Sequence, residues 1–539
     1  VLLKGTSLGV ATDATGKFKL EIPAQKEMIL IFNFIGMASQ TITVTKSEEL
    51  HVVLKEDTRE LEDVVVTGYY TQAKNAYTGE LTTVKGEDLL KVSPTNLIQV
   101  LASLVPGLRI VENNEQGSNP NAIPEILIRG ANSIMTENQA DVNTPLIMLD
   151  GVEISIQELY DLDIYDIGQV TVLKDAAATS IYGARAANGV IVVETVKPEA
   201  GKLQVSYTGN INLSMPDLSS YNLMNSREKL EFELLAGRYD PASWSTASEV
   251  KLNELYNEKL KVIESGVNTY WLAEPLRVGV NQKHSLYVQG GEGNFLFGLG
   301  AGYNGISGVM EKSDRSVLSG NIDLIYRMSK FQFSNKFSLT STHFKNPIVA
   351  FSAYAAANPY YKKYNDEGTV DKWLEYNDYF KASNPLWNAS QNSRDKGSNL
   401  LLSNYFMAEY FPTTEWRVRA RLGLTYGNDD TEKFYSRNDT RYENVETTKK
   451  GEFHSNNVRT NQVEAELSVT YAKVLGKHRI NLVAGGNISS NKSLTQGYSA
   501  VGFPDGDFSY PSFSNGYPEN GTPTYYETVS RSVNGYFNT

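Results

Sequence analysis

The sequence of 539 residues predicts a three-part, mainly antiparallel β-protein whose largest part is a membrane β-barrel. Beyond Lys202 the chain alternates apolar and polar residues in segments of about ten, which is typical of barrel strands. Before that point stands a compact strand–helix–strand pattern, which indicates a mixed α+β domain. The length agrees with several parts, because one ordinary core rarely grows this large.

The first part, residues 1–57, is predicted to be a small, β-sandwich-like domain whose first strand is cut off at Val1. Its residues 17–22, KFKLEI, alternate in the manner of a strand. Residues 58–80 are predicted to form a linker, because this segment begins with a run of charged residues. Residues 64–67 of this linker, VVVT, are β-branched and therefore favour an extended backbone.

The second part, residues 81–200, shows both helix and strand signals. A helix is expected over residues 96–104, where Pro106 and Gly107 end the pattern. Strands are expected over residues 126–129 and 146–149. We therefore expect an α+β domain of moderate size.

The stretch QVTVLKDAAATSIYGARAANGVIVVET closes this second part. Residues 170–173 are expected to form a strand, after which Asp175 can cap an alanine-rich helix. Asn188 and Gly189 then suit a turn into a strand over residues 190–194.

The third part, residues 201–539, is predicted to be the sheet of a barrel with about ten strands, the last near residues 529–537. In WRVRARLGLTY, Trp416 and every second residue after it are apolar, while Arg417, Arg419 and Arg421 share the other face. We expect Trp416 to face lipid and the arginines to face the lumen.

Short and long connections are expected to alternate between these strands. The short turns are 290–294, 327–330, 412–415 and 474–477, and the long connections are 216–281, 342–398, 427–457 and 490–524. A soluble sandwich, the alternative, seldom has a loop beyond ~15 residues at every second connection, whereas outer-membrane barrels do.

Composition excludes several classes of function. The net charge of -12 disfavours a nucleic-acid partner, and the absence of cysteine excludes disulfides and thiolate chemistry. The five histidines stand far apart, so no metal site or cofactor is predicted. Asp161, Asp163 and Asp166 are interpreted as a polar turn, and no catalytic residues and no enzymatic activity are predicted.

Three elements together resemble the plug domain of the SusC-like (SusC/RagA family) TonB-dependent outer-membrane transporters. They are PEILIRGANS, PLIMLDGVE and TVLKDAAATSIYGARAANGVIVVET, in the family's order. The residues that match the family's plug signature, for which the resemblance implies a structural role, are Arg129, Gly130, Asp150, Gly151, Lys174, Asp175, Tyr182, Gly183, Arg185, Asn188 and Gly189.

The resemblance extends to both sides of the plug. Residues 1–57 resemble the family's carboxypeptidase-regulatory-like domain, and LEDVVVTGY resembles its TonB-box region. The resemblance therefore implies that TonB contacts Asp63, Val64, Val65, Val66 and Thr67 by strand addition. A strand of the first domain is the alternative for this segment. Family barrels close with about 22 strands, so the chain is expected to be a fragment or an incomplete sequence.

The resemblance implies TonB-dependent import of a glycan or oligopeptide across the outer membrane. A SusD-like surface lipoprotein would act as a lid, pairs of transporter and lipoprotein could dimerise, and outer-membrane lipid would surround the barrel. The plug and first domain would lie toward the periplasm. The alternatives are a receptor for a metal chelate or vitamin without a lid, and an adhesive or structural outer-membrane protein.

Several residues keep two interpretations at this point. Arg129 and Arg185 can pair inside the plug or contact the barrel wall. We expect the row of Arg417, Arg419 and Arg421 to pair with plug carboxylates. The aromatic stretch 350–364 can stack on ligand or form a loop core. The sequence assigns no substrate-binding residue.

Overall fold

The computed structural model divides the chain into two compact units, residues 1–66 with 71–78 and residues 67–70 with 79–539. The residues that the structure describes are 2–3, 9–10, 12, 16–21, 28–32, 40–44, 46, 49–54, 64–66, 71–73, 81–93, 97–111, 119–128, 130, 143–174, 182, 186–244, 248–475, 478–506 and 508–538.

The first unit contains a three-stranded antiparallel sheet, β1 (Leu2–Leu3), β2 (Met28–Phe32) and β3 (Gln40–Val44). Alternate residues of β2, among them Leu30 and Phe32, are buried, so the sheet has one core face. A separate hairpin pairs β4 (Val64–Val66) with β5 (Thr71–Ala73).

The second unit begins with the plug, a five-stranded sheet in the order β10-β9-β12-β11-β6. Strands β12 and β9 are parallel, and the other neighbours are antiparallel. The plug strands are β6 (Leu81–Lys85), β9 (Leu146–Leu149), β10 (Val152–Ile154), β11 (Ile167–Leu173) and β12 (Val190–Thr195), with β7 (Leu108–Val111) and β8 (Glu125–Ile128) as a separate pair.

Helices α1 (Gly86–Val92), α2 (Leu97–Leu104) and α3 (Ile156–Asp161) contribute to the core of the plug. In α2 the residues Leu97, Ile98, Val100 and Leu101 are buried. The expected helix at 96–104 and the strands at 126–129, 146–149 and 190–194 are present within one residue, and the strand expected at 170–173 begins three residues earlier, at Ile167. The helix expected after Asp175 lies outside the described residues.

Two tight turns in the plug motifs depend on residues that adopt positive φ. Asp150 and Gly151 have φ of 48° and 83°, so the two-residue turn between β9 and β10 has positive φ at both positions, as an Asp-Gly hairpin turn requires. Gly189 has a φ of 90°, and a Cβ there would lie 3.1 Å from the carbonyl oxygen of Leu173. A larger residue at Gly189 would therefore be strained and crowded.

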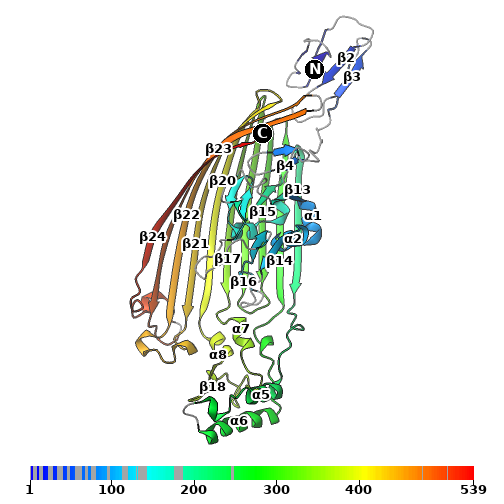
Figure 1. Cartoon of the computed structure of the whole chain (residues 1–539). Helices are drawn as coiled ribbons and strands as arrows, with labels where there is room; N and C mark the ends of the chain where they lie inside the picture. Colours follow the sequence, from blue (N-terminus) through cyan, green and yellow to red (C-terminus); the bar gives the residue numbers. More distant parts are fainter. Residues whose placement is uncertain are drawn as a thin grey trace. The chain divides into compact units, whose positions relative to one another are not determined.

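The rest of the second unit is built on a ten-stranded antiparallel sheet that runs in sequence order (Figure 1). Its strands are β13 (Gly201–Ser214), β14 (Gly279–Glu292), β15 (Phe295–Ser307), β16 (Asp314–Met328), β17 (Phe331–Asn346), β20 (Arg394–Tyr410), β21 (Trp416–Tyr435), β22 (Glu452–Leu475), β23 (His478–Val501) and β24 (Thr524–Asn538). The predicted fold, a partial barrel of about ten strands with an α+β plug, is confirmed.

The outer face of this sheet is apolar and exposed. Leu467 and Ile488 are each 57% exposed, whereas Glu464 and Glu466, on the opposite face of β22, are buried. Aromatic residues gather on the outer face near the short turns, where Phe331 stacks on Tyr410 at 4.7 Å and Trp416 packs on Tyr471 at 4.8 Å. An apolar band that ends in an aromatic row is typical of a barrel surface at a lipid boundary.

Short turns lie at one end of the sheet, and the long connections gather at the other end with α5 (Ser226–Leu235), α6 (Glu249–Glu264), α7 (Phe351–Ala355), β18 (Trp373–Tyr376), β19 (Lys381–Ser383) and α8 (Pro385–Ser390) (Figure 1). One expectation was wrong, because the connection 308–313 between β15 and β16 is short yet lies among the long ones. Gly308 and Ser313 close it by a backbone hydrogen bond.

The long connections have a core of their own. Phe351, Tyr354, Tyr360 and Tyr361 are buried together with Trp271 and other residues from 218–382. For the aromatic stretch 350–364, the structure therefore supports the loop-core interpretation over ligand stacking. No helix in the described part of the chain is long and apolar enough to cross a membrane.

Candidate functional site

The candidate functional site is the interface between the plug and the inner face of the sheet. Three aspartates of the plug, Asp150, Asp161 and Asp163, form ion pairs with cations of three strands. Their partners are Lys336 on β17, Arg315 on β16 and Lys283 on β14. All three cations belong to the face that points away from the apolar outer surface.

The Asp161–Arg315 pair is the most buried of the three. Its side chains are 6% and 3% exposed, and the Nη2 of Arg315 lies 2.7 and 2.6 Å from the two carboxylate oxygens. Nε of Arg315 adds a third bond at 3.0 Å, and Thr342 donates to the same carboxylate at 3.2 Å. A guanidinium bound to both oxygens fixes the orientation as well as the distance of helix α3.

The Lys283–Asp163 pair is similar in burial, with 2.8 Å between Nζ and Oδ1 and both side chains 7% exposed. Asp163 also caps the 3-10 helix Ile164–Asp166 through the backbone N–H of Tyr165. The sequence segment interpreted as a polar turn is therefore a helical segment that places two aspartates against the wall.

Lys336 connects the plug turn to the wall. Its Nζ lies 3.2 Å from Asp150 and 3.6 Å from Asp323 of β16, and it also donates to the hydroxyl of Thr195. Burial raises the pKa of Asp150, but Lys336 and the hydrogen bonds from Thr195 outweigh it and hold the pKa below its usual value.

The pKa of Asp166 is shifted in the opposite direction. Burial, together with the nearby carboxylate of Asp163, raises the pKa of Asp166 to about 7. Burial likewise raises the pKa of Glu158 on α3 to about 7, so the interface contains acidic groups whose charge changes near neutral pH.

The arginine row on β21 does not bind the plug as expected. Arg417 and Arg419 pair with Glu409 of the neighbouring strand β20, and Arg421 pairs with Glu466 of β22. From the plug, the backbone carbonyl of Asp150 accepts a hydrogen bond from Arg421 at 3.1 Å. The ion pairs found for the row are therefore with glutamates of neighbouring strands, and not with plug carboxylates as expected.

The described signature residues have structural positions inside the plug. Lys174 is buried and donates to Thr82 at 2.8 Å, Tyr182 is 3% exposed, and Asn188 lies 3.5 Å from the carbonyl of Thr144. Gly130 has a φ of 97°, another left-handed position. Arg129, Asp175, Gly183 and Arg185 lie outside the described residues.

The segment expected to bind TonB is partly described. Val64, Val65 and Val66 form β4, which among the described strands pairs with β5 alone. Asp63 and Thr67 lie outside the described residues. One edge of β4 is therefore occupied by β5, and a further strand would have to add at the other edge.

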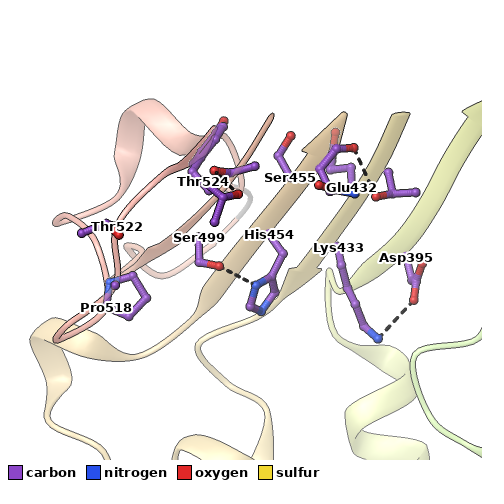
Figure 2. A pocket seen from close by; sticks show the side chains of 14 residues that line it. Asp395, Glu432, Lys433, His454, Ser455, Ser499, Pro518, Thr522 and Thr524 are labelled. Carbon is purple, nitrogen blue, oxygen red and sulfur yellow. Dashed lines mark hydrogen bonds and ion pairs between the residues drawn. The ribbon is translucent and has the colours of Figure 1, made fainter. Parts of the chain in front are cut away.

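Two polar cavities adjoin the inner face of the sheet. One, of about 540 Å³, lies beside the plug and is lined by residues of α3, such as Gln157 and Glu158, and by wall residues such as Asn321 and Gln462. The other, of about 480 Å³, lies at the long-connection ends of β20 to β24 and is shown in Figure 2. Among the described residues, no group of three or more histidines and carboxylates is placed to hold a metal ion.

Comparison with known proteins agrees with this architecture. Residues 73–190 match the TonB-dependent Receptor Plug Domain, and residues 1–66 match the CarboxypepD_reg-like domain. TonB-dependent receptor SusC of Bacteroides thetaiotaomicron is 29% identical over 408 residues, which are 73% of this chain. The resemblance to the SusC-like TonB-dependent receptors is confirmed. The SusC-like chain spans 38% of the length of SusC.

Solved structures share the fold of the SusC-like chain. The RagAB peptide transporter superposes with a TM-score of 0.68 at 17% identity, covering 84% of this chain and 52% of that chain. The unliganded ferric citrate transporter FecA gives a TM-score of 0.52 at 14% identity, covering 86% and 53%. These relatives are named as receptors and transporters, and none of these three is named as an enzyme.

Sequence reasoning missed the cations that pair with the plug. Lys336 stands in FQFSNKFSL between Phe333 and Phe337, so its place on the polar face was readable from the alternation. Its partner was not readable, because alternation gives the face of a side chain and not the residue across the lumen.

Proposed function

We propose that the protein imports a glycan or oligopeptide across the bacterial outer membrane, driven by TonB and assisted by a SusD-like surface lipoprotein that closes over the ligand. The observation that supports this most directly is the polar interface between plug and wall. An apolar interface would resist separation in water, whereas the side chains of three ion pairs can be rehydrated when the plug moves. The plug can then be displaced without unfolding the sheet.

The names of the relatives support the same proposal. SusC is a TonB-dependent receptor, and RagAB is a peptide transporter. We extend both properties to this chain, with the short-turn end toward the periplasm and the long connections outside. The choice between glycan and peptide does not follow from these two relatives.

TonB is proposed to bind at Asp63, Val64, Val65, Val66 and Thr67. Strand addition needs an extended backbone with a free edge, and β4 is extended and pairs with β5 at one edge. Main-chain hydrogen bonds would supply most of the affinity, so the backbone donors matter more than the side chains.

The test uses the full-length protein in cells that grow on single glycans or peptides as carbon source. Deletion of residues 63–67 should abolish growth on the compound that the parent protein supports, while surface binding of that compound persists. Val65→Pro, which removes a donor and fixes φ, should slow uptake far more than Val65→Thr, which keeps both. Normal uptake by Val65→Pro would exclude this segment as the TonB contact.

A further inference from the structure

The pocket at the ends of β20 to β24 takes most of its strand residues from the face of the sheet that contacts the plug. Five polar residues stand directly opposite one another in strand register and form what we call the wall row. They are Asn346 on β17, Asp395 on β20, Lys433 on β21, His454 on β22 and Ser499 on β23. The last four line the pocket, as Figure 2 shows.

The first residue of the wall row is bound to the plug. Asn119 and Asn121 of the plug both donate to Oδ1 of Asn346, at 3.1 and 3.0 Å. Asn121 also donates to the carbonyl of Lys345 at 2.7 Å and accepts from Arg315 at 3.3 Å. The plug turn at 119–121 is therefore held by the same wall segment that holds helix α3.

One carboxylate, that of Asp395, links the pocket to Asn346, the wall residue that binds this plug turn. Nδ2 of Asn346 donates to Oδ1 of Asp395 at 3.2 Å, and Nζ of Lys433 lies 3.2 Å from Oδ2 of the same residue. A group that draws Lys433 or Asp395 toward the pocket must change the bond to Asn346. Asn346 in turn orients the two plug asparagines.

The chemistry of the lining indicates an uncharged ligand rich in hydroxyl groups. Lys433 is compensated by Asp395, and Glu432 is paired with Arg394, so the charges of these lining residues are balanced. The remaining polar side chains are mostly hydroxyls and an amide, contributed by Thr431, Ser455, Asn456, Ser499, Thr522 and Thr524. Such groups both donate and accept, as sugar hydroxyls do.

We propose that this pocket binds a neutral sugar unit of the transported ligand and that Asp395 and Asn346 couple its occupancy to the plug turn at 119–121. The inference rests on the proposed import function and selects the glycan over the peptide. A volume of about 480 Å³ lies within the range of small-ligand sites. His454, whose Nδ1 lies 2.8 Å from the hydroxyl of Ser499, would bound the site on the side of β22 and β23.

The experiment measures binding of a panel of neutral and acidic oligosaccharides and of mixed oligopeptides to the full-length protein in detergent. Lys433→Met and Asn456→Leu remove polar groups from the pocket and keep side-chain size. We expect the parent to bind at least one neutral oligosaccharide and each variant to bind it about tenfold more weakly, the effect of one lost polar contact. Lys492→Met is the matched control, since Lys492 lies on β23 in an exposed ion pair with Glu527 and neither residue lines the pocket.

Coupling is read separately by hydrogen exchange of the backbone amides of Asn119, Asn121 and Ala122. Saturation with that oligosaccharide should change their exchange rate in the parent and in Lys492→Met. Asn346→Leu should abolish the change, because the link between Asp395 and the plug turn is broken. An unchanged rate in the saturated parent would overturn the coupling.

The remaining outcomes separate this inference from the import function. Equal affinity of parent and both pocket variants would overturn the site, even if the protein binds and imports glycans. Binding of peptides alone would overturn the sugar assignment and leave import intact. Sugar binding at the pocket in cells that show no TonB-dependent uptake would instead overturn the import function.

Discussion

Asp161 and Arg315 form a pair in which neither charge has ready access to water, and each therefore depends on the other. Leaving one buried charge without its partner costs more than the intact pair contributes. Asp163 and Asp150 form two further pairs, so each of three strands, β14, β16 and β17, contributes one cation that pairs with the plug. The docking of the plug is therefore sensitive to single substitutions at these positions.

Arg315→Met should loosen the plug by about 3–5 kcal/mol, the usual cost of removing one partner of a buried pair. Hydrogen exchange over α3, residues 156–161, should rise accordingly. Arg227→Met is the control, because Arg227 and Glu264 form an exposed pair worth under about 1 kcal/mol. The double variant Arg315→Met with Asp161→Leu should recover most of the loss, and failure to recover would contradict this account.

Asp166 supplies a prediction about pH. Its folded pKa of about 7 lies above the ordinary value of 3.8, so ionisation costs the folded state stability once the pH exceeds about 4, and the cost is complete above about 7. Asp166→Asn removes this cost. The protease resistance of the plug in the variant, relative to the parent, should increase from pH 4 to pH 8, and a constant ratio would refute the assignment.

At the scale of elements, the sheet was the part most readable from the sequence. Alternation fixes which face each residue occupies, and the two sides of β21, Trp416 outward and Arg417 inward, follow from it directly. The plug strand β9, with four buried residues, was readable as a short apolar run. Gly189 marked the turn into β12 through backbone chemistry alone.

The remaining features depend on pairs that are distant in sequence. Arg315 and Asp161 are 154 residues apart, and Asn346 and Asn121 are 225 apart. Nothing local distinguishes Glu409 from a plug aspartate as the partner of Arg417. The short connection 308–313 was missed because the strand before it, β15, is rich in glycine and has little alternation to mark its end.

The two ends of the sheet predict accessibility from outside the cell. Asn365 lies in the long connection after β17, and Thr413 lies in the short turn between β20 and β21. A cysteine placed at position 365 should react with an impermeant reagent in intact cells, and one placed at position 413 should react only after lysis. The reverse pattern would invert the assigned orientation.

At the scale of the whole molecule, the outer face of the sheet decides where the protein resides. Exposed apolar residues such as Leu318, at 54%, would aggregate in water and are satisfied in lipid. The full-length protein should therefore fractionate with the outer membrane, be released by detergent and not by salt, and show no hydrolase activity on the compounds it binds. Recovery in the soluble periplasmic fraction would contradict the barrel assignment.

The position of β6 has a mechanical consequence. The chain enters the plug through β6, which among the described strands lies at the edge of its sheet and pairs with β11 alone. A tension applied to the residues before Leu81 would meet this edge strand first, and its five residue pairs with β11 could separate while β9, β12 and β11 stay joined. The plug would then lengthen by extending its first strand, with Asp161 and Asp163 still bound to the wall. Its stiffness under load would be that of one edge strand and not of the whole domain.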